Sequence, residues 1–319
     1  MSVEAEPLGA LVIGGGPAGL MAAEVLATAG HRVVVAEAKP SVGRKFLMAG
    51  KSGLNLTKDE PFETLLASYA EAAPRLRPIL EAFDGDAVQR WAQELGQEVF
   101  IGSTGRVFPV SMKASPLLRA WLNRLDGLGV QRRVRWRWQG WQGDALLFDT
   151  PEGPQSLSPA VTVLALGGAS WARLGSDGEW VSYLSEKGLE IASFQPANTG
   201  LSVAWSDHMA QLFGQPIKGI ALHAGSHVSR GEAVISTRGL EGGGLYTISR
   251  FVRDGAPLAI DLMPDWSVER IAARLARPRA KASLNNHLRK SLKLDKVHIA
   301  LLQEFGRPLP YDPAELAGL

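Results

Sequence analysis

The sequence predicts an α/β protein: a Rossmann-like domain with a mostly parallel sheet and a small β-meander, joined to an inserted domain that is β-rich and helical. A strand, a glycine-rich turn, a helix and a second strand follow one another over residues 10–37. Strand and helix patterns then alternate up to about residue 195. From Pro196 onward, strand patterns with glycine-rich turns precede a mostly helical segment. We therefore expect one domain over residues 1–195 and the insert over residues 196–319.

The first strand–helix–strand unit is defined by the spacing of its glycines. Ala10–Ile13 is a short apolar strand that runs directly into a Gly-x-Gly-x-x-Gly turn over residues 14–19. Pro17 lies in the first turn of the helix that follows, and a glycine stands just past the end of that helix. A second apolar strand over Arg32–Ala36 then leads to Glu37.

This succession is typical of a dinucleotide-binding site. Gly14 permits the tight turn, Gly16 lets the backbone approach a pyrophosphate, and Gly19 lets the helix pack close to the strand. The start of the helix offers free N–H groups and a partial positive charge. Glu37 is placed to accept hydrogen bonds from ribose hydroxyls and would repel a 2′-phosphate, which favours FAD or NAD over NADP. An ordinary βαβ unit, whose glycines serve only the turn, is the alternative.

The remaining patterns of the first domain describe a loop, a hairpin, a helix and further strands. Residues 46–57 combine glycines with small polar side chains and show no period, so we expect a loop that wraps a ligand. A hairpin is expected over residues 98–110, and Ser115 with Pro116 marks the start of a helix. Strands are expected over residues 130–141, 145–149 and 161–166.

The insert domain has two parts with different sequence patterns, a strand-rich part and a helical part. Residues 266–304 are mostly helical and basic. Before them, glycine-rich turns separate strand patterns, which indicates an antiparallel sheet. These strands are expected over residues 200–205, 219–229 and 232–237.

Composition describes an ordinary globular protein and excludes several classes of chemistry. Hydrophobic residues make up 45% of the chain and the formal net charge is only +2, so no global field indicates nucleic acid or an anionic membrane. The chain has no cysteine, which excludes disulfides, zinc–thiolate sites and the cysteine-pair chemistry of disulfide-reductase flavoproteins. Its first residues lack a signal-peptide pattern and no stretch approaches the ~20 apolar residues of a membrane span, so we expect a cytoplasmic protein.

Four further motifs, together with the glycine turn, resemble those of a known family. The motifs lie between about residues 10 and 250 and follow one another in the same order as in that family. The chain resembles the BaiN-like family of NAD(P)/FAD-dependent oxidoreductases, in particular a branch of uncharacterised flavoproteins. The motifs are Gly43-Arg-Lys45 with Ala49-Gly-Lys-Ser-Gly-Leu-Asn-Leu-Thr57, Gly105-Arg-Val-Phe-Pro-Val110, Ala165-Leu-Gly-Gly-Ala-Ser170 and Gly175-Ser-Asp-Gly178.

The resemblance implies FAD as the cofactor. It implies that Arg44 and Lys45 lie near the FAD phosphates and ribose, the 49–57 loop near the isoalloxazine ring, and the 165–168 turn near the adenosine–pyrophosphate side. Cationic side chains suit a diphosphate, although a solvated basic turn is the alternative for Arg44 and Lys45. With the first motif, the predicted cofactor-binding residues are Gly14, Gly15, Gly16, Pro17, Ala18, Gly19, Glu37, Ala38, Lys39, Gly43, Arg44, Lys45, Asn55, Ala165, Gly167 and Gly168.

The chain departs from the family's pattern in three places. Leu166 replaces the threonine of an Ala-Thr-Gly-Gly motif, and Lys51-Ser52 stand where many relatives have a glycine pair. Relatives also end on a further Rossmann segment with Gly-Glu-x-x-Asp and Thr-Gly-Gly-Tyr-Asn-like motifs, which does not appear before Leu319. We therefore expect a truncated version of a longer protein, without the C-terminal FAD-binding segment.

By this resemblance, the expected function is that of an FAD-dependent oxidoreductase. Its flavin would be reduced by NAD(P)H and would pass hydride to an unsaturated organic substrate. No side chain is identified as catalytic, and Lys51, Ser52 and Asn55 are candidate proton donors by loop position alone. One alternative is an oxygen-using flavoenzyme that oxidises amines or hydroxyls. Another is a non-catalytic or truncated dinucleotide-binding or RNA-associated protein.

Three other patterns, a basic and aromatic run, the basic helices and a pair of histidines, do not indicate a functional site. The run at 132–138 alternates basic and aromatic residues, so on one strand Val134, Trp136 and Trp138 would share a face opposite the arginines. We interpret this run and the basic helices as solvated faces, because the basicity of a nucleic-acid-binding domain is missing. We therefore expect a small-molecule substrate, and neither nucleic acid nor a membrane as a partner. His223 and His227 lack further ligand candidates, so no metal site is expected.

Overall fold

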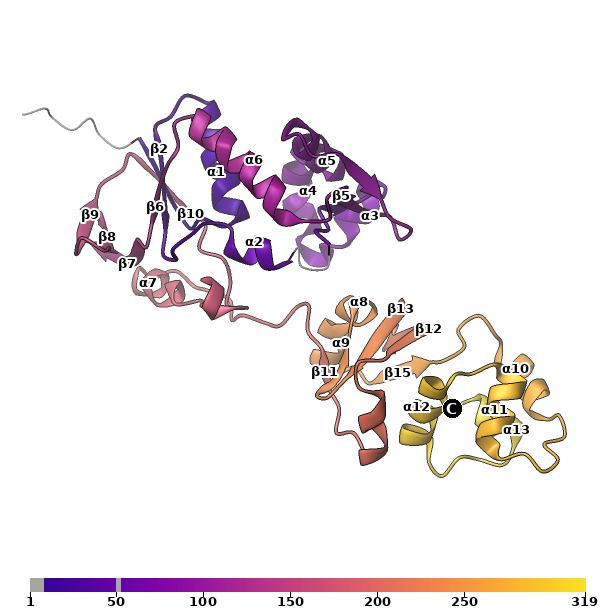
Figure 1. Cartoon of the computed structure of the whole chain (residues 1–319). Helices are drawn as coiled ribbons and strands as arrows, with labels where there is room; N and C mark the ends of the chain where they lie inside the picture. Colours follow the sequence, from indigo (N-terminus) through magenta and orange to yellow (C-terminus); the bar gives the residue numbers. More distant parts are fainter. Residues whose placement is uncertain (1–8, 50–52) are drawn as a thin grey trace, which may run out of the picture. The chain divides into compact units, whose positions relative to one another are not determined.

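The computed structural model describes residues 9–49 and 53–319 (Figure 1). The chain divides into two compact units, Met1–Phe194 and Gln195–Leu319. Each unit contains two hydrophobic clusters of its own. Among the described helices, none has the length and apolar character needed to cross a membrane.

A four-stranded parallel sheet forms the centre of the first unit. Its strands lie in the order β10, β1, β2, β6, and every neighbouring pair is parallel. All residues of β1 are apolar and buried, as expected for a parallel sheet that is covered on both faces. The bounds are β10 (Val161–Leu164), β1 (Ala10–Ile13), β2 (Val33–Glu37) and β6 (Gln131–Val134).

Alternate residues of β1 and β2 pack against different layers on the two faces of this sheet. Val12 and Val35 belong to a cluster with helices α1 and α6. Leu11 and Val34 belong to a cluster with Phe148 of an antiparallel meander, β7-β8-β9. The predicted α/β class with a parallel sheet is confirmed. The bounds are α1 (Pro17–Thr28), α6 (Ala114–Gly127), β7 (Arg137–Gln142), β8 (Ala145–Asp149), β9 (Gln155–Leu157) and, contacting β7, α7 (Trp180–Glu186).

A three-stranded antiparallel sheet and several helices occupy the chain between β2 and α6. The sheet has the order β3-β5-β4, and its β4–β5 pair confirms the hairpin predicted over residues 98–110. The elements are α2 (Arg44–Ala49), β3 (Thr57–Lys58), α3 (Phe62–Ala67), the 3-10 turn Ala70–Ala72, α4 (Ala73–Ala82), α5 (Gly85–Glu94), β4 (Val99–Ile101) and β5 (Arg106–Pro109).

The loop expected over residues 46–57 is wrong at its start, where the chain forms helix α2. The Leu47 N–H donates to the Gly43 carbonyl at 2.9 Å, and Phe46 packs against the core cluster of α1 and α6. Tertiary packing therefore decides a segment whose pattern is ambiguous. Residues 50–52 lie outside the described part of the chain, and residues 53–56 have no regular structure.

The single strand expected over residues 130–141 is also wrong. Arg135 adopts a left-handed conformation with a φ of 59°, so the chain turns there and β6 and β7 belong to different sheets. The Trp136 N–H donates to the Glu37 carbonyl at 2.9 Å, which attaches the new chain direction to the end of β2. The face expected to be shared by Val134, Trp136 and Trp138 is therefore broken.

The second unit is built on a five-stranded antiparallel sheet in the order β11-β14-β13-β12-β15. The strand expected over residues 219–229 is divided, because Gly225 with a φ of 59° turns the chain between β12 and β13. The elements are β11 (Leu201–Ser202), the 3-10 helix η3 (Asp207–Leu212), β12 (Pro216–Ala224), β13 (His227–Ser236), β14 (Gly239–Glu241), α8 (Gly243–Tyr246), α9 (Ser249–Arg253) and β15 (Leu258–Asp261).

Four helices follow this sheet in the described chain, and the first three agree with the helical pattern at 266–304. Helix α12 connects the two parts of the unit, because Val297 and Leu301 pack into the sheet's cluster while Ile299 packs among the helices. Ser267, Ser283, Asp295 and Asp312 accept hydrogen bonds at the four helix starts. The bounds are α10 (Val268–Leu275), α11 (Leu284–Leu292), α12 (Lys296–Gly306) and α13 (Pro313–Ala317).

The meander should be essential to the stability of the parallel sheet. We expect Phe148→Ala to lower the free energy of unfolding of the first unit by about 3–5 kcal/mol, because the ring is fully buried between the two layers. Phe83→Ala is the matched control, since that ring is 40% exposed. Hydrogen exchange of β1 and β2 peptides in increasing denaturant measures the change for this unit alone. Equal protection in both variants would contradict the assigned role of the meander.

Candidate functional site

The candidate site lies at the carboxyl edge of the parallel sheet. After β1 the chain passes through α1 to β2 and β6 on one side, whereas β10 pairs with β1 on the other side. Ligands of open α/β sheets bind at such a reversal of strand order. A cavity of about 420 Å³ opens there, between the ends of the strands, the start of α1 and residues 174–183.

The turn after β1 brings backbone to the cavity without side chains. Gly14 has a φ of 110°, and a Cβ there would lie 2.2 Å from the carbonyl oxygen of Ala165. A Cβ at Gly19 would lie 1.9 Å from the carbonyl oxygen of Gly14. Around Gly16, by contrast, a Cβ would meet no atom within 4 Å. No side chain caps α1 at Gly16, so the first N–H groups of this helix can bind an anion.

Glu37 is fixed by two backbone hydrogen bonds. Its Oε2 accepts from the N–H of Gly15 at 2.8 Å, and its Oε1 accepts from the N–H of Lys39 at 2.7 Å. Both oxygens retain lone pairs that can accept from hydroxyl groups. The carboxylate is therefore held against the glycine turn with acceptor capacity left for hydroxyl groups.

Two cations of α2 line the same cavity. The Lys45 ammonium donates to the hydroxyl oxygens of Ser170 at 2.9 Å and of Ser176 at 3.2 Å. The Arg44 guanidinium reaches Ser41 at 3.5 Å, but its Nε is buried and has no partner within the described structure. An orphaned buried donor of this kind is expected where an anionic ligand binds.

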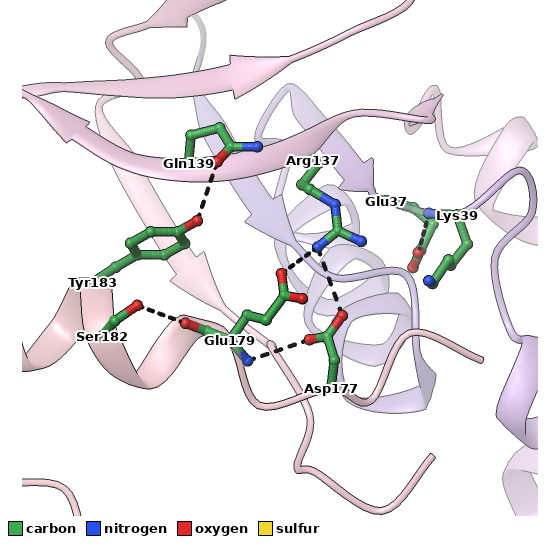
Figure 2. Close-up of polar contacts among 8 residues, drawn as sticks. All are labelled: Glu37, Lys39, Arg137, Gln139, Asp177, Glu179, Ser182 and Tyr183. Carbon is green, nitrogen blue, oxygen red and sulfur yellow. Dashed lines mark hydrogen bonds and ion pairs between the residues drawn. The ribbon is translucent and has the colours of Figure 1, made fainter. Parts of the chain in front are cut away.

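The opposite wall contains residues that the sequence did not indicate as a site. Figure 2 shows the Arg137 guanidinium, at the start of β7, between two acids of the loop before α7. Its NH1 lies 2.7 Å from Glu179 Oε2 and 3.6 Å from Asp177 Oδ2. Beside this cluster, the Tyr183 hydroxyl donates to Gln139 at 3.1 Å.

An indole completes this wall. The Trp180 Nε1 donates to the carbonyl oxygen of Gly167 at 3.1 Å, which connects α7 to the turn after β10. That turn continues through the 3-10 helix Ala172–Leu174 to Ser176, whose side chain is buried. The alternating run at 132–138, interpreted from the sequence as a solvated face, contributes Trp136 and Arg137 to the lining of this cavity.

The structure brings most of the predicted cofactor-binding residues together. Gly19 packs against the Gly14 carbonyl and does not line the cavity; neither do Lys39, Gly168 or the exposed Asn55. The candidate proton donors Lys51 and Ser52 lie outside the described residues. The predicted residues that line the cavity are Gly14, Gly15, Gly16, Pro17, Ala18, Glu37, Ala38, Gly43, Arg44, Lys45, Ala165 and Gly167.

Across residues 9–49 and 53–319, no group of three or more His, Asp or Glu side chains is arranged to hold a metal ion. The His227 ring stacks on Phe251 with a centroid separation of 3.4 Å. This contact gives His227 a packing role on the sheet of the second unit.

Two family models match the chain. The HI0933-like protein Rossmann domain matches residues 9–250, and the HI0933-like protein barrel and H2TH domain matches residues 195–312. The ribosomal RNA dihydrouridine synthase of Escherichia coli (strain K12) is 23% identical over 314 residues, which cover 95% of this chain and 75% of that protein.

Solved structures resemble parts of the chain. THI4 from Thermovibrio ammonificans is 19% identical with a TM-score of 0.36, over 58% of this chain and 64% of that chain. The open conformation of a flavocytochrome c3 fumarate reductase is 19% identical with a TM-score of 0.42, over 51% of this chain and 34% of that one. The chain therefore spans less than two thirds of these solved proteins.

Substitution of Gly16 tests the site without destabilising the fold. We expect Gly16→Ser to keep or raise the unfolding temperature, because a Cβ there meets no atom within 4 Å and serine is a favoured N-cap. If the cavity binds FAD, the cofactor expected from the sequence, the serine should nevertheless weaken that binding about tenfold or more, since it would fill the space next to the helix start and occupy N–H groups of the first turn. Calorimetric titration with FAD measures the affinity. Gly127→Ser is the control, because it adds the same side chain in open space outside the cavity; equal affinities in the two variants would place the phosphates elsewhere.

Proposed function

Because the chain belongs to the HI0933-like family, a family of FAD-dependent oxidoreductase-like proteins, we propose that its first unit binds FAD. This membership also confirms the predicted resemblance to the BaiN-like family. One observation carries the proposal: the glycine turn, the uncapped start of α1 and Glu37 converge on a single cavity at the reversal of strand order.

The residues of this cavity fit the adenosine diphosphate part of FAD. The open space at Gly16 and the free N–H groups of α1 would receive the diphosphate. The unpartnered Nε of Arg44 would donate to a phosphate oxygen, and the ammonium of Lys45, with one donor still unused, would add a second positive charge. Glu37 would accept from the ribose hydroxyls while it retains its two backbone bonds.

We propose that NAD(P)H is the electron donor and that the substrate contains an unsaturated carbon–carbon bond. When bound, FAD supplies hydride transfer between a nicotinamide and such a bond. In this site the described side chains bind and orient the cofactor. Glu37 and the glycine turn fix its adenosine end, and the wall formed by Arg137 and Trp180 closes the cavity on the other side.

For the substrate we propose a uridine within RNA. The name of the Escherichia coli relative, a ribosomal RNA dihydrouridine synthase, supports this choice. In such a reaction one hydride and one proton add across the carbon–carbon double bond of the pyrimidine ring, while NAD(P)H is oxidised to NAD(P)⁺. The proposal replaces the expectation that nucleic acid is not a partner, which rested on the small net charge of the whole chain.

Anaerobic reduction tests the electron donor. We expect NADH or NADPH to bleach the visible absorption band of the FAD-loaded protein, and uridine-containing RNA to restore it. The same protein with photoreduced flavin is the control for substrate turnover, since it needs no nicotinamide. A band that persists with both nicotinamides would show that the donor is a different reductant.

Substitution of Glu37 tests the orientation of the cofactor. Glu37→Ala removes a charged acceptor for the ribose hydroxyls, so we expect the dissociation constant for FAD to rise by about 10- to 100-fold. Glu98→Ala is the control, because Glu98 is exposed and lies outside the cavity. Calorimetric titration gives the affinity, and circular dichroism confirms that both variants are folded. Equal FAD retention in the two variants would show that Glu37 does not contact the ribose.

A further inference from the structure

The positive charge of this chain is concentrated in the helical part of its second unit. Between residues 270 and 296, nine side chains are arginine or lysine and only Asp295 is acidic. Within residues 9–49 and 53–319, ion pairs of this unit engage other cations, such as Arg230, Arg253 and His298. None of the nine forms an ion pair with a carboxylate in the described part of the chain, and all except Arg274 are exposed. They are Arg270, Arg274, Arg277, Arg279, Lys281, Arg289, Lys290, Lys293 and Lys296.

The turn between α11 and α12 is fixed in a way that presents two of these lysines to solvent. Lys293 adopts a left-handed conformation with a φ of 61° at the end of α11, and Lys296 begins α12. Between them, Asp295 accepts from the N–H of His298 at 3.0 Å and from its Nδ1 at 2.8 Å. The other ring nitrogen of His298 lies 3.0 Å from the Lys218 carbonyl, which attaches the turn to β12.

Two grooves flank this turn, and cations line both. The larger, about 690 Å³, has Arg289, Lys296 and Arg307 in its wall. The smaller, about 230 Å³, has Lys218 and Lys293 beside Trp266, together with Asp265 and Asp295. The guanidinium groups of Arg270 and Arg274 lie 3.9 Å and 5.5 Å from the centroid of the Trp266 ring. We call these cations the basic surface: Lys218, Arg270, Arg274, Arg289, Lys293, Lys296 and Arg307.

Amide side chains accompany the cations of the larger groove. Asn286 accepts from Arg289 at 2.9 Å, and Asn285 accepts from Gln303 at 2.9 Å. Glu304 lies in the same groove, where the Ser206 hydroxyl and N–H hydrogen-bond to its carboxylate and hold its pKa below the usual range. This carboxylate is therefore ionised at neutral pH, and the cations of the groove still outnumber its acids.

On the premise of the proposed RNA substrate, we propose that the basic surface is the docking surface for that RNA. Guanidinium and ammonium groups bind backbone phosphates, and amides can hydrogen-bond to bases and sugars. Cations that are spread over two grooves, on either side of a hydrogen-bonded turn, suit a chain of phosphates rather than a single anion. A membrane fits less well, because Leu288 and Leu292 of α11 are buried and Leu284 is partly buried, so this helix has no exposed apolar face.

The test compares charge reversals on and off this surface. The surface variant is Arg289→Glu with Lys296→Glu, and the glutamate at the first position of α12 favours its helix dipole. The matched control is Arg75→Glu with Arg90→Glu, two exposed arginines of α4 and α5 in the first unit. Both variants and the unaltered chain, with FAD added, are titrated against a fluorescein-labelled RNA stem–loop with uridines in its loop. Fluorescence anisotropy at several salt concentrations gives the affinity and its salt dependence.

We expect the surface variant to lose at least about tenfold in RNA affinity, with the slope of log K against log salt reduced by about 2. The control should change the affinity by less than about twofold. Equal losses in both variants, or no loss in either, would overturn the assignment of the surface. Binding to phosphatidylserine vesicles without binding to the RNA would also overturn it, in favour of a membrane.

The outcome is separable from that of the proposed function. Circular dichroism and FAD binding show whether the surface variant is folded, and neither should change, because the substituted residues lie outside the FAD cavity. Selective loss of RNA binding in a chain that binds no FAD would support the surface and contradict the FAD proposal. A chain that binds FAD and is reduced by NAD(P)H, but does not bind the RNA, would contradict the surface alone.

Discussion

The candidate site depends on the contact of three backbone segments at Gly14. The Gly14 N–H donates to the Ala36 carbonyl at the end of β2, and the Ala165 N–H donates to the Ile13 carbonyl. A Cβ at Gly14 or Gly19 would lie 2.2 Å or 1.9 Å from a carbonyl oxygen. The first turn of α1 and the end of β10 can therefore approach β1 only where side chains are absent. The same approach opens the cavity at their junction.

The meander that covers the second face of the sheet also supplies one wall of this cavity. Because Arg135 turns the chain, β7 leaves the parallel sheet and carries Arg137 to the loop before α7. The pairs of Arg137 with Asp177 and Glu179 are partly exposed, and pairs of this kind contribute little to stability. Their consequence is positional, since they hold the 175–180 loop beside the glycine turn. Packing of one face and construction of the site are thus coupled in a single short meander.

The predictable parts of the site are those that depend on local sequence. The β1–α1–β2 unit and Glu37 follow from residues that are close together in the chain, where glycine spacing and apolar runs are strong signals. The pair of Arg137 with Glu179 joins positions 42 residues apart, and neither side chain has a pattern that indicates the other. Helix α2 was expected as a loop because its formation depends on Phe46 packing into a distant core. Contacts between residues far apart in the sequence were therefore harder to predict than individual helices and strands.

The net charge of the whole chain does not describe the charge of its separate parts. A formal net charge of +2 describes the whole chain, but a ligand responds to charges within about one Debye length, ~8 Å at physiological salt. The acids that reduce the net charge lie mostly outside residues 270–296. Three acids, Asp265, Asp295 and Glu304, line the two grooves, against five arginines and lysines. Asp295, the one acid within that segment, uses its carboxylate to start α12 and to orient His298. Net charge alone therefore cannot exclude a polyanionic partner from a chain built of separate units, because each unit presents its own field.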